Sequence, residues 1–435
     1  MPGAAVVLGS VDEWLGRETG DALHGHVPRR RAPDGAIELT LHPAARPVRI
    51  EANDAGRIVA TAMTVPVGPG YHTYLVNLLD RLGDELGVQW TKLATPPPGA
   101  AGRVSAAGRA TTAVADPDAS IDPTGALGSG DRHDAERGHL GWLRSALTAV
   151  RDGRRQGASG LHLATPPGTR FTFDGAVATV LGPRDDDWLE RALADPRVAA
   201  DVWPWIADAL DARYLLGRAL SSMWLEVRWR PPVGVEEIQL GDEVLGTLRR
   251  AYPLQPGLAW PWAEWRELLA LRGDHDPATR ALVDRGIASV GGGESAPVRQ
   301  IGYRRRPVTI THAGWSLEVP GSFTDRRTDE EWSGSEAGRT VTLAGTETAE
   351  GGRPMTADRF LQQVAGHLGT AAIEHDDGIV RGRARLASDT SSGVEVATVE
   401  GFSAIRGRGA AIRIEIDDPQ DWKWALDTWR ALRPA

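Results

Sequence analysis

The 435-residue chain contains no cysteine, and this absence excludes several kinds of site. Disulfides, thiol nucleophiles, iron–sulfur clusters and cysteine-type zinc sites all need thiolates, so a metal would have to be bound by histidine and carboxylates. Lysine is nearly absent too, since it occurs only at positions 92 and 423 and the other basic residues are arginine. We expect neither a metal nor a cofactor.

Long apolar runs are also missing. A transmembrane helix needs about 18 consecutive apolar residues, and no such run occurs, so we predict no membrane span. The first residues lack the basic region of a signal peptide. The net charge of −9 argues against a nucleic-acid partner, which needs a basic face. The sequence therefore favours a cytoplasmic protein whose partner is another protein.

Familiar catalytic motifs are absent as well. The chain has no Gly-x-Ser-x-Gly elbow, no phosphate-binding Gly-Lys-Ser/Thr loop, no Gly-x-Gly-x-x-Gly after a strand and no His-Glu-x-x-His. Catalytic groups can still converge from distant positions, so an enzyme is not excluded. The absence of motifs favours a protein without catalytic activity.

The length predicts at least two domains, because single hydrophobic cores rarely exceed about 250–300 residues. Residues 1–35 lack clear periodicity and are interpreted as a loosely attached arm. The first domain is predicted at 36–285, with a flexible insertion at about 94–130 that is rich in proline, glycine and alanine and has no aromatic residue. A glycine-rich linker at 286–307 leads to a second domain at 308–435.

The first domain has the patterns of an α+β fold. Short apolar runs at 37–41, 48–50 and 58–65 predict a β-meander. Leucines at helical spacing predict a helix over Leu75–Leu86, and Asp131 is a candidate N-cap for a second helix. We predict short antiparallel strands in this domain, around a helical core rich in tryptophan.

The turn Gly68-Pro69-Gly70 precedes the first of these helices and is followed by Tyr71 and His72. Unpaired backbone N–H groups at a helix start can hold an anion, which would place Tyr71 and His72 beside a ligand. Alternatively, the glycines supply unusual dihedral angles and Tyr71 packs in the core. Both interpretations stay open from the sequence.

Eight of the sixteen tryptophans lie between Trp188 and Trp265. Apolar residues at helical spacing predict a long helix over 206–224. An aromatic stripe at this spacing indicates a helical core, but tryptophan is also enriched where proteins bind each other. Guanidinium groups near indole rings stack well or bind carboxylates and phosphates. The candidate binding residues at this arginine-bearing edge are Arg218, Trp224, Arg228, Trp229 and Arg230.

The C-terminal 128 residues show a different order of elements. A strand ends at Val319-Pro320-Gly-Ser-Phe323, one helix follows, two long strands end near Ile405 and Ile416, and an amphipathic helix closes the chain. The second long strand alternates at Ile412, Ile414 and Ile416, which predicts an antiparallel sheet with one face in water. This order resembles the PsbP-like domains, including the DcrB type. The resemblance implies an antiparallel sheet flanked by helices and a role in binding or assembly, and it carries no catalytic residues across. Residues 1–300 resemble no family that we identify.

Two functions remain after these observations. The first is a non-catalytic cytoplasmic binding or assembly protein, which uses the Trp/Arg-rich surface of its first domain and an accessory C-terminal domain. The second is a hydrolase or transferase acting on an anionic substrate at the Gly68-Pro69-Gly70 turn, with His72 as general base and Tyr71 or Arg218 orienting the substrate.

Overall fold

The chain folds into two compact units of α+β structure, as the sequence predicts. In the computed structural model, the first unit comprises Met1–Pro167 and Phe173–Tyr303, and the second comprises Gly168–Thr172 and Arg304–Ala435. The predicted insertion at 94–130 lies outside the described residues except for Gly130. The structure describes residues 4–23, 27–52, 57–88, 90, 130–158, 160–165, 169–171, 176–290, 300–328, 330–369, 372–389 and 396–435.

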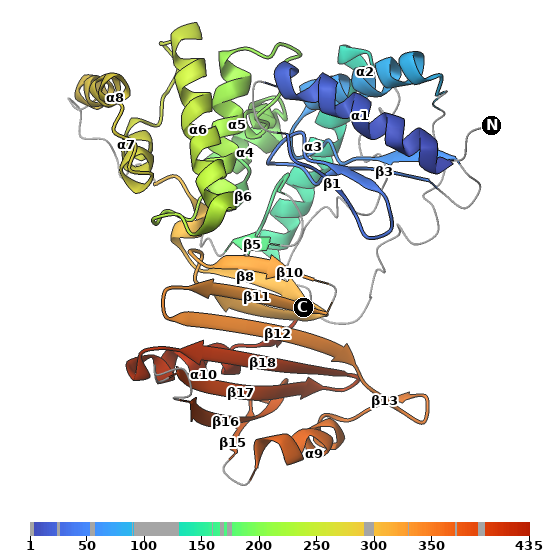
Figure 1. Ribbon diagram of the computed structural model, residues 1–435, viewed down its shortest axis with the longest axis vertical. Helices are drawn as coiled ribbons and strands as arrows, with labels where there is room; N and C mark the ends of the chain where they lie inside the picture. The colour runs from blue at the N-terminus through green and yellow to red at the C-terminus, as the bar shows by residue number, and fades with distance from the viewer. Residues whose placement is uncertain are drawn as a thin grey trace. The chain divides into compact units, whose positions relative to one another are not determined.

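Residues 1–35 are not the loosely attached arm that their composition suggests. Helix α1 spans Ala4–Ala22 (Figure 1). It buries Val11 and Trp14. The Trp14 indole Nε1 donates a hydrogen bond to the Glu85 carboxylate at 2.8 Å. Val11 and Trp14 are three residues apart, so their side chains lie on one face of the helix. The surrounding glycines weaken this helical pattern in the sequence.

A four-stranded antiparallel meander follows, and the three predicted strands are part of it. Ile37 and Val48 are buried on one face, since alternate side chains of a strand point to opposite faces. The first strand contains the arginine run at 29–31 and is fully exposed. In spatial order the strands are β1 (Arg29–Arg31), β2 (Ile37–Leu39), β3 (Val48–Ala52) and β4 (Ile58–Thr61).

Both predicted helices of the first third are present. Helix α2 (Pro69–Leu86) ends at Gly87, whose φ of 68° is the left-handed conformation that glycine adopts without strain. Helix α3 (Arg132–Arg155) is capped by Asp131, whose carboxylate accepts from the backbone N–H groups of His133 and Asp134. The apolar face of α3 contributes Leu143 and Leu147 to a core that also contains Trp188 and Trp203.

The rest of the first unit is largely helical. The helix predicted over 206–224 begins later, at Ala212, because Asp211 caps it with its carboxylate. The predicted linker begins too early at 286, since the last helix continues to Val290. The elements are β6 (Val177–Thr179), β7 (Gly182–Arg184), α4 (Asp186–Ala194), η1 (Val198–Val202), α5 (Ala212–Leu225), α6 (Gly234–Leu254), α7 (Trp262–Leu271) and α8 (Pro277–Val290).

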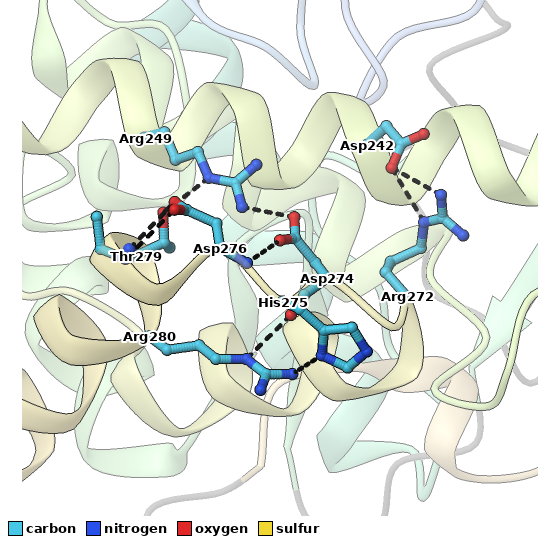
Figure 2. A network of polar contacts seen from close by, with 9 residues as sticks. Asp242, Arg249, Arg272, Asp274, His275, Asp276, Thr279 and Arg280 are labelled. Atoms are coloured by element: carbon cyan, nitrogen blue, oxygen red, sulfur yellow. Dashed lines mark hydrogen bonds and ion pairs between the residues drawn. The ribbon is translucent and has the colours of Figure 1, made fainter.

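Ion pairs connect α6 to the short loop between α7 and α8 (Figure 2). Arg249 of α6 contacts Asp274 at 2.5 Å and donates to the Thr279 hydroxyl at 3.0 Å. The hydrogen bond from Arg249, followed by that from the backbone N–H of Asp276, lowers the pKa of Asp274. Arg272 binds Asp242 at 2.8 Å in the same way. These polar contacts fix the loop between α7 and α8 against α6.

The second unit is built on antiparallel sheets, and one of its strands comes from the middle of the chain. Strand β5 (Thr169–Phe171) pairs with β8 (Val308–His312), in a described sheet ordered β19-β9-β8-β5. The larger described sheet has seven strands in the order β10-β11-β12-β18-β17-β16-β15. The remaining elements are η2 (Tyr303–Arg305), β9 (Trp315–Val319), β10 (Thr324–Arg327), β11 (Glu331–Glu336), β12 (Arg339–Glu347), β13 (Ala349–Glu350), β14 (Arg353–Pro354), α9 (Ala357–Leu368), β15 (Ile373–Asp376), β16 (Arg381–Asp389), β17 (Val396–Ile405), β18 (Arg408–Ile416), η3 (Pro419–Asp421), α10 (Trp422–Arg430) and β19 (Arg433–Pro434).

The two helices of this unit pack on opposite faces of the large sheet. On β18, Ile412, Ile414 and Ile416 are buried while Arg413 is exposed, which confirms the predicted alternation. The indole of Trp429 on α10 donates to the hydroxyl of Ser403, which lies on the isoleucine face. Helix α9 covers only one end of the other face, where its side chains reach Phe402 and Gly409. The opposite end of that face is left to polar side chains.

Candidate functional site

Most of the tryptophans between Trp188 and Trp265 are buried. Trp229 and Trp262 are half-buried, and the other six are at most 7% exposed. Trp224 packs against Gly182 and the ring of Tyr303, so it belongs to the core and offers no surface to a partner. The stretch therefore forms the interior of the first unit, and the candidate binding surface is narrower than the sequence suggests.

The Gly68-Pro69-Gly70 turn is filled by the neighbouring Trp203–Trp205 segment. The backbone N–H of Gly70 donates to the carbonyl of Trp205 at 3.2 Å, and the Trp205 N–H donates to the Val67 carbonyl at 3.0 Å. A Cβ on Gly70 would lie 2.7 Å from Trp205 Cδ1. The glycines thus permit close backbone packing, and the predicted anion site at this turn is already occupied by protein.

His72 lies in the interior on helix α2. Its ring is 2% exposed, and Nδ1 lies 3.0 Å from the Thr64 hydroxyl. The same hydroxyl lies 3.4 Å from Nε2 of His139, whose ring is perpendicular to that of His72 at 5.5 Å between centroids. A general base must reach a substrate proton, and a ring buried in this way does not reach one.

Arg218 is buried rather than available to a ligand. The residue is 5% exposed, and its guanidinium Nη2 contacts the Glu243 carboxylate at 2.7 Å. Its Nη1 donates to the backbone carbonyl of Leu41, also at 2.7 Å. A buried charge needs a partner, and the Glu243 carboxylate supplies it for the Arg218 guanidinium. Arg218 therefore connects α5, α6 and the segment after β2.

Trp205 is the centre of a buried group of polar rings, which we call the Trp205 cluster: His42, Tyr71, Tyr74, Trp205 and Tyr214. Ring centroids lie 4.6 Å from Trp205 for Tyr214, 5.0 Å for Tyr74, 5.6 Å for Tyr71 and 6.4 Å for His42. Five buried atoms in it have no hydrogen-bond partner within the part of the chain that the structure describes. They are His42 Nε2, Tyr71 Oη, Tyr74 Oη, Trp205 Nε1 and Tyr214 Oη.

The protonation of the Trp205 cluster follows from its burial. Burial and then the positive charge of Arg218 hold the pKa of His42 well below its usual range. His42 Nδ1 accepts a hydrogen bond from the Ala44 backbone N–H, so the proton of the neutral ring is on Nε2. Burial likewise raises the pKa of Tyr71, and it raises that of Tyr74 to about 12. Burial raises the pKa of Tyr214 too, so the cluster is neutral and each of its five rings carries a proton to donate.

Removing the buried hydroxyl of Tyr71 tests this arrangement. An unpaired hydroxyl has lost its water without gaining a partner, so we expect Tyr71→Phe to raise the free energy of unfolding by up to about 1 kcal/mol. The raised pKa adds an alkaline effect. Above the unfolded pKa near 10 the Tyr71 phenol ionises more readily in the unfolded chain than in the folded one, so the free energy of unfolding of the wild type falls as the pH rises toward the folded pKa. Tyr71→Phe has no such phenol, so the variant should lose less stability above pH of about 10.

Urea unfolding of both proteins at pH 7 and across the alkaline range measures this change. If Tyr71→Phe instead lowers the free energy of unfolding at pH 7 by more than about 1 kcal/mol, the hydroxyl has a hydrogen-bond partner after all. Tyr252→Phe provides a control, because Tyr252 is half-buried and lies at the end of α6.

The loop between α5 and α6 contains the remaining candidate residues. Trp229 has a φ of 58°, and its indole Nε1 donates to the Met223 carbonyl at 3.2 Å. Arg228 and Arg230 have side chains only 14% and 18% exposed, because both approach the carboxylate of Glu237. The arginine-bearing edge is therefore present, but its charges are largely neutralised within the protein.

No family model matches the chain, and no curated protein matches it in sequence. A protein from Bacteroides thetaiotaomicron VPI-5482, with a crystal structure at 1.50 Å resolution, aligns with a TM-score of 0.25 at 7% identity. The match covers 29% of this chain and 47% of that chain, so it spans less than half of the neighbour. We draw no conclusion on function from it, and the PsbP-like resemblance stays a prediction.

Several residues of these arrangements have no signal in the sequence. His42 and Trp205 sit in ordinary loop contexts, and Glu243 and Glu237 are unremarkable acidic residues of a helix. Glu243 gains a role through Arg218, 25 residues away, and Glu237 through Arg230 in the preceding loop. In the described part of the chain, no helix is long and apolar enough to cross a membrane.

Proposed function

We propose that this protein is a non-catalytic binding protein that contacts a protein partner through residues 226–235, which comprise the loop between α5 and α6 and the first two residues of α6. The second unit serves as an accessory domain. Because a chain without cysteine needs no oxidising compartment, the proposal places the protein in the cytoplasm.

The observation that carries the proposal is the backbone of Trp229. A bulky residue at a φ of 58° is a genuine outlier, because its Cβ crowds the backbone in the left-handed region. Such residues cost about 1–3 kcal/mol and cluster at sites where function needs a fixed loop shape. Trp229 also packs on Gly302, whose own φ is 122°. The chain thus retains a strained backbone at Trp229, in the middle of this loop.

The strained loop presents apolar side chains to solvent. Val233 and Val235 are 61% and 67% exposed, at the start of α6. Glu237 fixes the loop, since its carboxylate accepts from Arg230 at 2.8 Å and from the Val233 backbone N–H at 2.9 Å. Rigid apolar groups beside partly exposed charges lose little entropy on binding, which favours contact with another protein.

The competing hypothesis of a hydrolase or transferase lacks comparable support. Its general base, His72, is buried, and the Gly68-Pro69-Gly70 turn is packed against Trp205. Tyr71 and Arg218, its substrate-orienting residues, are buried as well. Nothing in the described geometry brings a substrate to these groups.

A photo-crosslinking amino acid at position 235 tests the proposed surface. In an extract of the cells that make this protein, we expect a discrete higher-mass adduct that an excess of the unlabelled protein suppresses and an excess of Val235→Asp does not. The matched control places the crosslinker at Leu254, which is 63% exposed at the other end of the same helix. Equal adducts from both positions, or none from position 235, would contradict the proposal.

A further inference from the structure

A small cleft of the first unit lies between the proposed binding loop, residues 226–235, the helix α6 and the end of α7. Its lining combines charged side chains with apolar ones, among them Val227, Leu240 and Leu268. Its volume is about 30 Å³, far below the roughly 300–1,000 Å³ of pockets that enclose a whole small molecule. A space of this size has room for about two or three water-sized groups. The cleft therefore fits the end of one side chain that a larger partner presents.

The charged part of the lining is mainly positive. It consists of three guanidinium groups and one carboxylate, which belong to Arg228, Arg230, Arg272 and Glu237. The Glu237 carboxylate accepts from Arg230 Nη1 and Nη2 at 2.8 and 3.1 Å and from the Val233 N–H at 2.9 Å. Its Oε1 lies 3.9 Å from Nε of Arg228, which is an ion-pair distance too long for a hydrogen bond. One carboxylate thus serves three cations in the lining, which favours a further carboxylate from outside.

Arg272 brings its charge to the cleft from the end of α7. Its side chain crosses α6 at Gly241, where a Cβ would lie 2.5 Å from Arg272 Cδ, so the missing side chain lets the arginine lie close to the helix. Nε and Nη2 of Arg272 both donate to Asp242, whose side chain is 59% exposed (Figure 2). An ion pair in contact with water contributes little, and a guanidinium has five N–H donors. Arg272 can therefore contact a second carboxylate as well.

Apolar side chains continue from the cleft to the exposed surface. Pro232 lines the cleft, and the next residue, Val233, is 61% exposed, while Val235 is 67% exposed. The hydrogen bond from the Val233 N–H to Glu237 fixes this part of the loop, so the loop loses little entropy when a partner binds. A rigid surface with apolar groups beside cations is complementary to a segment with an aliphatic side chain beside an acidic one.

We propose that the protein partner of this loop presents an aspartate or glutamate side chain to Arg228 and Arg272 in the cleft, and a neighbouring aliphatic side chain to Val233 and Val235. This inference rests on the proposed function, because it names the chemistry of the partner segment for the same surface. A carboxylate accepts hydrogen bonds from guanidinium groups in bidentate geometry, which adds specificity to the charge attraction. The small volume of the cleft favours one side chain of a protein over a free small molecule.

Selection from a display library of short random peptides against the full chain tests this chemistry. We expect enrichment of peptides with Asp or Glu next to an aliphatic residue, and an enriched synthetic peptide should bind more weakly as the salt concentration rises. Arg272→Gln should weaken its binding about tenfold or more, and Arg272→Lys, which keeps the charge, by a smaller factor. Arg266→Gln is the matched control, because it removes the same charge from an exposed position of α7 and should leave binding unchanged.

Several results would overturn this inference. Enrichment of no peptide, enrichment of peptides without an acidic residue, or an unchanged affinity in Arg272→Gln would each show that the cleft does not select a carboxylate. An equal loss in Arg266→Gln would show attraction by overall charge. Circular dichroism and thermal unfolding establish that each variant is folded, and Arg228→Gln makes the same comparison if Arg272→Gln does not fold.

The crosslinker at position 235 separates this inference from the proposed function. Absence of the adduct would reject binding of a protein at this loop altogether. An adduct that forms equally well when the same chain carries Arg272→Gln would reject only the acidic contact. An adduct that Arg272→Gln weakens and Arg266→Gln leaves unchanged is the result that we expect.

Discussion

Arg218→Ala is expected to lower the free energy of unfolding of the first unit by about 3–5 kcal/mol. The substitution leaves the Glu243 carboxylate without its 2.7 Å partner and the Leu41 carbonyl without a donor, both in or near the interior. Removing one member of a buried pair costs more than the pair contributes, because the remaining charge has no compensation. A binding residue, in contrast, is replaced with little effect on stability.

Urea unfolding, monitored by hydrogen–deuterium exchange of the α5 amides, measures the loss of stability in the first unit, to which α5 belongs. Arg137→Ala is the control, because Arg137 forms a pair with Asp134 in which both side chains are largely exposed, and it should change stability little. The double variant Arg218→Met with Glu243→Leu removes both charges and should recover much of the loss. If Arg218→Ala unfolds like the wild type, Arg218 does not hold the core together.

Arg218 also shows where sequence reasoning reaches its limit. Its position near Tyr214 and Trp224 was readable from helical spacing, but Glu243 lies 25 residues away and the Leu41 carbonyl 177 residues away. An arginine on an apolar helix is consistent with a ligand site and with an internal ion pair. Only the long-range contact decides between them, and a single sequence does not contain it.

Local signals performed better. The Asp131 cap, the leucine face of α2 and the alternation of β18 were predicted, because each depends on neighbours within a few residues. Strand β5 was not assigned to the second unit, since its pairing with β8 crosses most of the helical part of the chain. The local composition around β5 does not indicate which strand it pairs with.

The proposed binding loop was predicted only in part. The sequence indicated its arginines, but not the exposed Val233 and Val235, because isolated valines are equally common in cores. The left-handed backbone of Trp229 had no warning either, since this conformation normally calls for glycine or asparagine.

Gly70→Ala is the second variant for which we expect a large effect. A Cβ at this position would overlap the Ala207 carbonyl and lie 2.7 Å from Trp205 Cδ1, so the Trp203–Trp205 segment would have to move away from α2. The hydrogen bond from the Gly70 N–H to the Trp205 carbonyl would lengthen with it. We expect a loss of about 1–3 kcal/mol or more in the free energy of unfolding, because overpacking against backbone is not relieved by a rotamer change.

The same substitution at Gly141 should have the opposite sign. Gly141 is exposed in the middle of α3 with no atom near its would-be Cβ, so alanine there lowers the entropy of the unfolded chain and favours the helix by about 0.5–1 kcal/mol. Urea unfolding of both variants compares the two positions directly. A ligand-binding turn at Gly68-Pro69-Gly70 would instead leave the stability of Gly70→Ala close to that of the wild type, because its glycines would face solvent. Opposite signs at the two glycines would therefore establish that this turn exists to let Trp205 pack against α2.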